Sequence, residues 1–232
     1  MPSNYEIKKR LCFIGKTAYE RGYIAGSEGN FSVLTYEKHL LITPSGLSKG
    51  FLEPDDIVET DMDGNLVRYG SKSLRASLKP SSEIKMHLVA YKKRNDIAAA
   101  VHAHPPYATA FALAGIPLTP CILPEVVVTI GAVPLAKYAT PSTEEVPKSI
   151  EGIIVRCDAV LLANHGVLTV GKTIDDAFIK LETVEHLAKV YFLSLLLGNV
   201  NYLTDEEVEK LRTARLKLGI VGPWWPCSVD KK

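Results

Sequence analysis

The sequence lacks long hydrophobic runs and extended basic blocks. Its longest apolar stretch, near VYFLSLLLGNV, is shorter than the ~20 residues of a membrane-spanning helix. The opening residues MPSNYEIKKR are polar and charged, unlike a secretory signal. The formal net charge is only +1, and basic residues gather in short pieces such as Lys92-Lys93-Arg94, whereas nucleic-acid binding usually leaves a stronger basic footprint. We therefore expect a cytoplasmic protein that binds neither membranes nor nucleic acids.

Cysteine is scarce, and no two cysteines form a C-x-x-C pair. Cys12, Cys121, Cys157 and Cys227 are scattered, so we interpret them as reduced thiols and keep a disulfide as the less favoured alternative. The chain also has no P-loop and no G-x-G-x-x-G fingerprint, which leaves nucleotide binding unsupported. Neither repeats nor linkers interrupt the 232 residues, and a 47% hydrophobic composition is enough for one sizeable core.

Hydrophobic periodicity predicts helices and strands that are interleaved without regular βαβ alternation. Helices are expected over residues 5–21, 81–94, 105–115, 173–198 and 204–219, the last two with Thr173 and Thr204 as N-caps. Strands are expected over 30–34, 39–46 and 96–104, and residues 56–70 should form a hairpin that turns at Asp63-Gly64. Residues 158–171 should form either a pair of strands or one strand that bends sharply at His165-Gly166. The pattern favours a single α/β domain over residues 1–232, with a mixed or antiparallel central sheet flanked by helices and residues 215–232 as a tail.

Two histidines stand one residue apart at the end of the expected strand 96–104. Alternation along a strand points His102 and His104 to the same face, beside the turn at Pro105. His165 lies at another strand end, and Gly166 after it permits a close backbone approach. Three histidine nitrogens with one open position are the pattern of catalytic zinc. The H-x-H pair alone is weak evidence, because two histidines at a polar strand end also occur without a metal. His39, His87 and His186 are better explained as satisfied core or surface histidines.

Three short segments could bind an anion or be ordinary structure. Ser81, Ser82 and Glu83 follow a proline at an expected helix start, where free N–H groups and hydroxyls suit an anion, although an N-cap is the simpler explanation. The glycine-containing segments 26–32 and 43–46 could offer N–H groups and the Asn30 amide to a phosphate, or could simply be turns.

These segments together resemble a known family. GSEGNFSV, ITPSG, PSSE, VHAHP, YATPSTEE and ANHGVL, in this order over about residues 5–195, are similar to the class II aldolase/adducin superfamily and, within it, most to the L-fuculose-1-phosphate aldolases. The resemblance implies a three-layer α/β fold and a homotetramer with sites between subunits. It also implies a zinc-dependent aldolase that cleaves a ketose 1-phosphate to dihydroxyacetone phosphate and an aldehyde.

The resemblance also implies residue roles. His102, His104 and His165 match the family's zinc ligands. Glu83 matches the family's glutamate, which contacts the zinc when the site is empty and acts as acid and base during turnover. The positions that match phosphate-binding residues are Gly29, Asn30, Ser45, Gly46, Ser81 and Ser82. This chemistry is coherent, because a divalent ion stabilises the enediolate that carbon–carbon cleavage leaves, and a neighbouring carboxylate can move its proton. Manganese, cobalt or iron(II) would tolerate the same imidazoles.

Two departures concern the aldehyde end of the substrate. The family has a tyrosine about twenty residues beyond the H-x-H pair and another in its tail, whereas this chain reads CILPEVVV and GPWWPC there. We hypothesise that Glu125 or a water supplies the proton, and that Trp224 and Trp225 pack at a subunit interface rather than close the site.

Alternative functions stay open on the same scaffold. An epimerase, a dehydratase or a decarboxylase of sugar phosphates would keep the metal site, and a non-catalytic, adducin-like interaction protein would not need it. Ribulose-phosphate epimerases carry aspartate after the paired serines, and adducins lack the metal histidines. Glu83 with three histidines therefore favours an aldolase.

Overall fold

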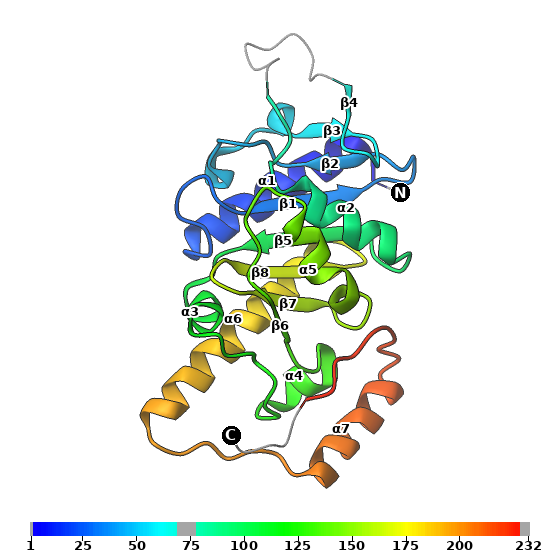
Figure 1. Cartoon of the computed structure of the whole chain (residues 1–232). Coiled ribbons are helices and arrows are strands. Elements are labelled where there is room, and N and C mark those ends of the chain that lie inside the picture. Colours follow the sequence, from blue (N-terminus) through cyan, green and yellow to red (C-terminus); the bar gives the residue numbers. More distant parts are fainter. Residues whose placement is uncertain (1, 69–77, 228–232) are drawn as a thin grey trace.

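The computed structural model describes residues 2–68 and 78–227 and contains one eight-stranded sheet (Figure 1). The order of its strands is β4-β3-β2-β1-β5-β8-β7-β6. Every neighbouring pair is antiparallel except β6 and β7, which are parallel, so the sheet is mixed as expected. The strands are β1 (Asn30–Leu34), β2 (Leu40–Ile42), β3 (Val58–Thr60), β4 (Leu66–Arg68), β5 (Ala99–Ala103), β6 (Leu135–Ala136), β7 (Ala159–Leu162) and β8 (Gly166–Gly171).

Helices cover both faces of the sheet, which gives the expected three layers. They are α1 (Asn4–Glu20), α2 (Ile84–Lys93), α3 (Pro106–Ala114), α4 (Pro124–Thr129), α5 (Glu145–Ile154), α6 (Ile174–Leu196) and α7 (Asp205–Lys217), with short 3₁₀ turns at Lys49–Phe51 and Pro54–Asp56. The predicted caps are present, since Thr173 accepts from the Asp176 amide and Thr204 forms a capping box with Glu207. The tail predicted from residue 215 begins inside α7, and residues 228–232 lie outside the described residues.

Strand alternation divides the core into two hydrophobic clusters. Val101 faces α1, α3 and α6, whereas Ala100 faces α2 and α5. In Figure 1, α2 and α5 lie in front of the sheet while α1 and α6 lie behind it. His102 is next in the alternation after Val101 and is fully buried, so its ring lies on the side of α2. The register of β5 therefore decides which helix faces the first predicted metal ligand.

Sequence patterns predicted most of the helices and strands but missed one helix start and two short helices. The predicted turn at Asp63-Gly64 is confirmed, with the Gly64 amide donating to Asp61 O; residues 69–70 of that hairpin lie outside the described residues. The helix predicted from Ser81 begins instead at Ile84, because Ser81 N donates to Thr43 O and ties this residue to the loop after β2. No helix was predicted at α4 or α5. No described helix is long and apolar enough to cross a membrane.

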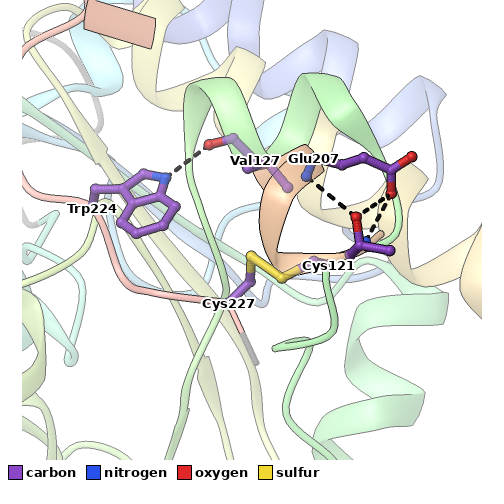
Figure 2. Close-up of a disulfide and its surroundings, with 6 residues drawn as sticks. Cys121, Val127, Glu207, Trp224 and Cys227 are labelled. Carbon is purple, nitrogen blue, oxygen red and sulfur yellow. Dashed lines mark hydrogen bonds between the residues drawn. A yellow bond between two sulfur atoms is a disulfide. The ribbon is translucent and has the colours of Figure 1, made fainter. Parts of the chain in front are cut away.

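The expectation of four reduced cysteines is wrong for two of them. Cys121 and Cys227 form a disulfide that closes a separation of 106 residues, with their Cα atoms 5.4 Å apart (Figure 2). Cys12 and Cys157 are free. No local spacing marks this pair, because the chain must first return from α7 to α4 before the two residues meet.

The C-terminal segment, by which we mean α7 with residues 218–227, packs against α4. Arg215 donates to the carbonyls of Val128 and Thr129, which are at the C-terminal end of α4. Trp224 Nε1 donates to Val127 O at 2.7 Å (Figure 2). Trp225 O accepts from the Ala132 amide at 2.9 Å. The two tryptophans therefore contact residues of their own chain, whereas their expected packing at a subunit interface stays a prediction.

Candidate active site

Three histidines from two distant segments meet at one end of the sheet. His102 is on β5, His104 follows that strand, and His165 lies in the turn between β7 and β8. Because β5 pairs with β8 in the register His102↔Leu168, that turn lies beside the end of β5. The three ring centroids are 4.7–5.0 Å apart, and one ring nitrogen of each lies within 4.8 Å of the others. The sheet therefore gathers the three residues that the sequence had selected.

Gly166 makes this approach sterically feasible. A Cβ atom at this position would lie 2.6 Å from Ala103 O and 2.6 Å from the His104 ring. Any larger residue would force β8 away from the histidines, so the glycine after His165 serves the close approach that its position suggested.

Hydrogen bonding orients one ring of the cluster, and burial keeps the other two neutral. His102 Nδ1 lies 2.9 Å from Val167 O, and because a carbonyl only accepts, this nitrogen carries a proton and leaves Nε2 to face Glu83 and His104. Burial and the neighbouring His102 lower the pKa of His104 to about 3 and that of His165 to about 4. Both rings are consequently neutral near neutral pH, which is the ligating form of imidazole.

Glu83 completes the cluster from the N-cap of α2. Its Oε2 lies 3.4 Å from His102 Nε2, and its Oε1 lies 3.2 Å from His165 Nε2. Burial alone would raise the pKa of Glu83, but His102 and His165 outweigh it and hold the pKa well below its usual range. Among the described residues Oε1 is buried and has no hydrogen-bond partner, although it lies close to His165.

These groups fit a divalent cation. Two Nε2 nitrogens of His102 and His104 lie 3.1 Å apart, and an orphaned carboxylate oxygen faces the same place. A cation would satisfy all of these acceptors together, and three imidazoles with a carboxylate are a donor set that zinc prefers.

A buried hydrogen-bonded chain holds Glu83 from behind. Asn30 Nδ2 donates to Glu83 Oε2 at 3.0 Å, and Asn30 Oδ1 accepts from His87 Nε2 at 2.5 Å. His87 Nδ1 then accepts from Ser32 Oγ at 2.6 Å, and Tyr91 OH lies 2.8 Å from the same oxygen. Burial lowers the pKa of His87 to about 3, so the ring is neutral and both its nitrogens are used. Sequence reasoning had correctly interpreted His87 as a satisfied core histidine but missed its link to Glu83, which the four-residue spacing from Glu83 on α2 could have suggested.

The candidate phosphate residues surround the same strand ends. Asn30 pairs with His102 across β1 and β5, and Gly29 precedes it at a positive φ of 72°. Ser45 N donates to Lys79 O, which places the loop after β2 beside the segment that leads to α2. Since the amides of Ser45 and Ser81 are already used, these two residues can offer an anion only their hydroxyls. Gly46 lies next to Ser45 in that loop, and Ser82 Oγ donates to or accepts from Ser142, whose Oγ is 2.9 Å away.

Two further predictions have different outcomes. Glu125 is in the first turn of α4 with an exposed side chain, and within the described residues no hydrogen bond or ion pair joins its carboxylate to the histidine cluster. Its role as proton donor stays a prediction. His39, which was interpreted as a satisfied core or surface histidine, has its Nδ1 2.9 Å from Glu59 Oε1 and, with Glu37 and Glu59, also forms a second group of potential ligands. Strand pairing of β2 with β3 brings this pair together.

Comparison with known proteins identifies the family. Residues 9–192 match the family model described as Class II Aldolase and Adducin N-terminal domain. An L-fuculose phosphate aldolase of Methanocaldococcus jannaschii is 36% identical over 193 residues, which cover 82% of this chain and 97% of that protein. A 3-oxo-tetronate 4-phosphate decarboxylase of Haemophilus influenzae is 34% identical over 212 residues, covering 88% and 95%. A solved structure of an L-fuculose 1-phosphate aldolase superposes with a TM-score of 0.82 at 37% identity, covering 92% of this chain and 97% of that one. The chain is therefore a member of the class II aldolase and adducin family, and the relatives named above are aldolases and a decarboxylase.

Proposed function

We propose that this protein is a zinc-dependent aldolase that cleaves a ketose 1-phosphate, similar to L-fuculose 1-phosphate, to dihydroxyacetone phosphate and an aldehyde. The observation that carries this proposal is the convergence of His102, His104 and His165 beside the Glu83 carboxylate. Such a set of donors would hold the ion while leaving room for substrate oxygens. A bound divalent ion would supply Lewis-acid stabilisation of the negative charge that develops as the carbon–carbon bond breaks.

The protein's own groups would share the remaining work. Glu83 is positioned to accept and return a proton at the carbon next to the carbonyl, with its carboxylate held by Asn30. The phosphate group would lie among Gly29, Asn30, Ser45, Gly46, Ser81 and Ser82. Its binding energy would orient the reacting carbons against Glu83.

A decarboxylase acting on a phosphorylated 3-oxo acid is the second candidate. Loss of carbon dioxide from such an acid also leaves negative charge beside a carbonyl, so the same donor set would serve it. The specific observations in its favour are the decarboxylase relative at 34% identity and the absence of tyrosine from CILPEVVV, where an aldolase of the fuculose type has its proton donor.

A substrate panel distinguishes the two candidates. We expect purified protein to release dihydroxyacetone phosphate from fuculose, rhamnulose or ribulose 1-phosphate, and to lose this activity when a chelator is added. Release of carbon dioxide from a 3-oxo-tetronate 4-phosphate without ketose cleavage would favour the decarboxylase. Activity that survives complete removal of the metal would rule out both.

Assembly, metal identity and location are part of the same proposal. We expect a homotetramer with sites between subunits, testable by light scattering, and zinc at one ion per chain, testable by elemental analysis. We also expect a single domain over residues 1–232 and a cytoplasmic protein. Disulfides are rare in that compartment, so the oxidised fraction of Cys121 and Cys227 in intact cells is a direct check of the location.

A further inference from the structure

Lys49 is a buried cation in a part of the molecule where the proposed function needs positive charge. Its relative exposure is 2%, and it begins the 3₁₀ turn after the loop that contains Ser45 and Gly46. The backbone of this turn packs on Gly15 of α1, where a Cβ atom would lie 2.5 Å from Lys49 O. The side chain is therefore enclosed by the fold and does not extend into solvent as a surface lysine does.

The ammonium group bridges two loops. Lys49 Nζ donates to Ser27 O and, at 3.0 Å, to Leu47 O. Ser27 is in the loop that leads to Gly29 and Asn30, and Leu47 directly follows Gly46. An ammonium has three N–H donors, so these two carbonyls leave one of them for another acceptor.

The charge of Lys49 is not neutralised by a close carboxylate. Within residues 2–68 and 78–227 no carboxylate oxygen lies within ion-pair distance of Nζ. Glu28, which acts on it electrostatically, directs its carboxylate to the amides of its own loop, at Ala25 and Gly26. Glu83 also acts on Lys49 electrostatically and, like Glu28, opposes the lowering of its pKa by burial. By contrast, Lys85 is half-exposed and forms a 2.5 Å ion pair with Glu144.

The other candidate phosphate-binding residues are all uncharged. Glycine, asparagine and serine offer neutral donors only, whereas a phosphate monoester carries nearly two negative charges at neutral pH and would have to bind near the Glu83 carboxylate. A buried, unneutralised ammonium between the two loops would supply the missing positive charge with little screening by solvent.

We propose that Lys49 is the cationic determinant of the phosphate site, which holds the loops 24–29 and 43–47 together and makes this site selective for a dianionic phosphate group. This inference rests on the proposed function, because it assumes a phosphorylated substrate. It differs from a purely structural role, in which the ammonium would only tie two loops together and any uncharged donor could replace it.

The test measures the affinity of metal-loaded, full-length protein for inorganic phosphate by calorimetry. Lys49→Arg keeps the charge, Lys49→Met removes charge and donors, and Lys49→Gln keeps an N–H donor without charge. Lys180→Met is the matched control, since Lys180 is also largely buried and also donates to a backbone carbonyl, at Val170, but pairs with Asp158 and Asp176.

We expect Lys49→Met and Lys49→Gln to weaken phosphate binding by roughly 10-fold to 100-fold, as expected for a hydrogen bond to a charged group. The affinity of Lys49→Arg for phosphate should be within a few-fold of that of the unaltered protein. Lys180→Met should bind phosphate as tightly as the unaltered protein does. If Lys49→Met does not fold, the comparison between Lys49→Gln and Lys49→Arg decides. The proposal is overturned if Lys49→Gln binds phosphate normally, or if the unaltered protein does not bind phosphate.

Failure of the proposed function would give a different result. A protein that cleaves none of the ketose phosphates but loses phosphate affinity in Lys49→Gln would contradict the aldolase proposal and support the role of Lys49. If the unaltered protein cleaves a ketose phosphate and Lys49→Gln cleaves it with the same KM, the aldolase proposal is supported and the role of Lys49 is contradicted.

Discussion

The two ends of this molecule are organised by different forces. At the histidine end, neutral rings, a carboxylate and an enclosed ammonium are held by hydrogen bonds around an orphaned acceptor, Glu83 Oε1. At the other end, Arg215 and the Trp224 indole attach the C-terminal segment to carbonyls of α4, and a disulfide joins it to Cys121, which precedes α4 (Figure 1, Figure 2). Desolvated polar groups cost stability unless a ligand satisfies them, whereas caps and cross-links add stability. The comparison suggests that the first end is built for binding and the second for cohesion.

The largest effect is expected at the proposed metal ligands. His102→Ala removes a fully buried nitrogen donor, so bound zinc should be lost and turnover should fall by at least about 100-fold to 1000-fold, the equivalent of several kcal/mol. Elemental analysis and the cleavage assay measure both quantities. His186→Ala is the matched control, because that histidine is exposed on α6 and belongs to neither group of potential ligands. Normal zinc content in His102→Ala would show that the histidine end does not hold the ion.

The disulfide should dominate stability at the opposite end. Cys227→Ser opens a cross-link over 106 residues, which corresponds to roughly 4–5 kcal/mol in the chain-entropy description. Urea denaturation should show this loss, whereas zinc content should be unchanged. Cys12→Ser, which alters a free cysteine, should have little effect. If Cys227→Ser lost zinc as readily as stability, the two ends would not be independent.

The pH dependence of stability tests how much free energy the burial of the Lys49 ammonium costs at the histidine end. Burial lowers its pKa to about 8, whereas the unfolded value is ~10.4. Between these pH values the unfolded state binds more protons than the folded state, so the free energy of unfolding should rise with pH, by up to about 3 kcal/mol. The difference between the unaltered protein and Lys49→Met, measured by urea denaturation from about pH 7 to about pH 10, isolates this contribution. Parallel pH profiles for the two proteins would show that the ammonium carries no such cost.

The hydrogen-bonded residues behind Glu83 should affect the rate of turnover more than the metal content. His87→Leu removes the donor to Asn30 Oδ1, which frees the amide that holds Glu83, and kcat should fall by roughly 10-fold to 100-fold. His87→Gln can restore an N–H donor and should recover part of the rate. Tyr91→Phe leaves the contact between His87 and Asn30 in place and should have a smaller effect. A proportional loss of zinc in His87→Leu would indicate a structural role in place of positioning.

The same contrast explains what the sequence could predict. His102, His104 and Gly166 are local signals at strand ends, and once β5 pairs with β8 their meeting follows from register. Ser81 was placed in a helix because propensity does not report a tertiary bond, and its amide donates to Thr43 O. Neither the bond between Cys121 and Cys227 nor the burial of Lys49 has a local signature, since both depend on segments that meet only after folding. The fold and the histidine site were therefore accessible, but the C-terminal attachment was not.

The smallest effect is expected at Trp224, and it tests whether the C-terminal segment contributes to catalysis. Trp224→Phe keeps an aromatic ring but removes the 2.7 Å hydrogen bond from Nε1 to Val127 O. The stability should fall by about 1 kcal/mol, as for one buried hydrogen bond, and kcat/KM should not change, because α4 and the C-terminal segment pack on each other within the chain. Arg212→Ala, which removes the guanidinium over the same ring, is a suitable companion variant. A tenfold loss of kcat/KM in Trp224→Phe with normal stability would mean that this segment reaches a catalytic site in the assembled protein, and the division between a binding end and a cohesive end would have to be abandoned.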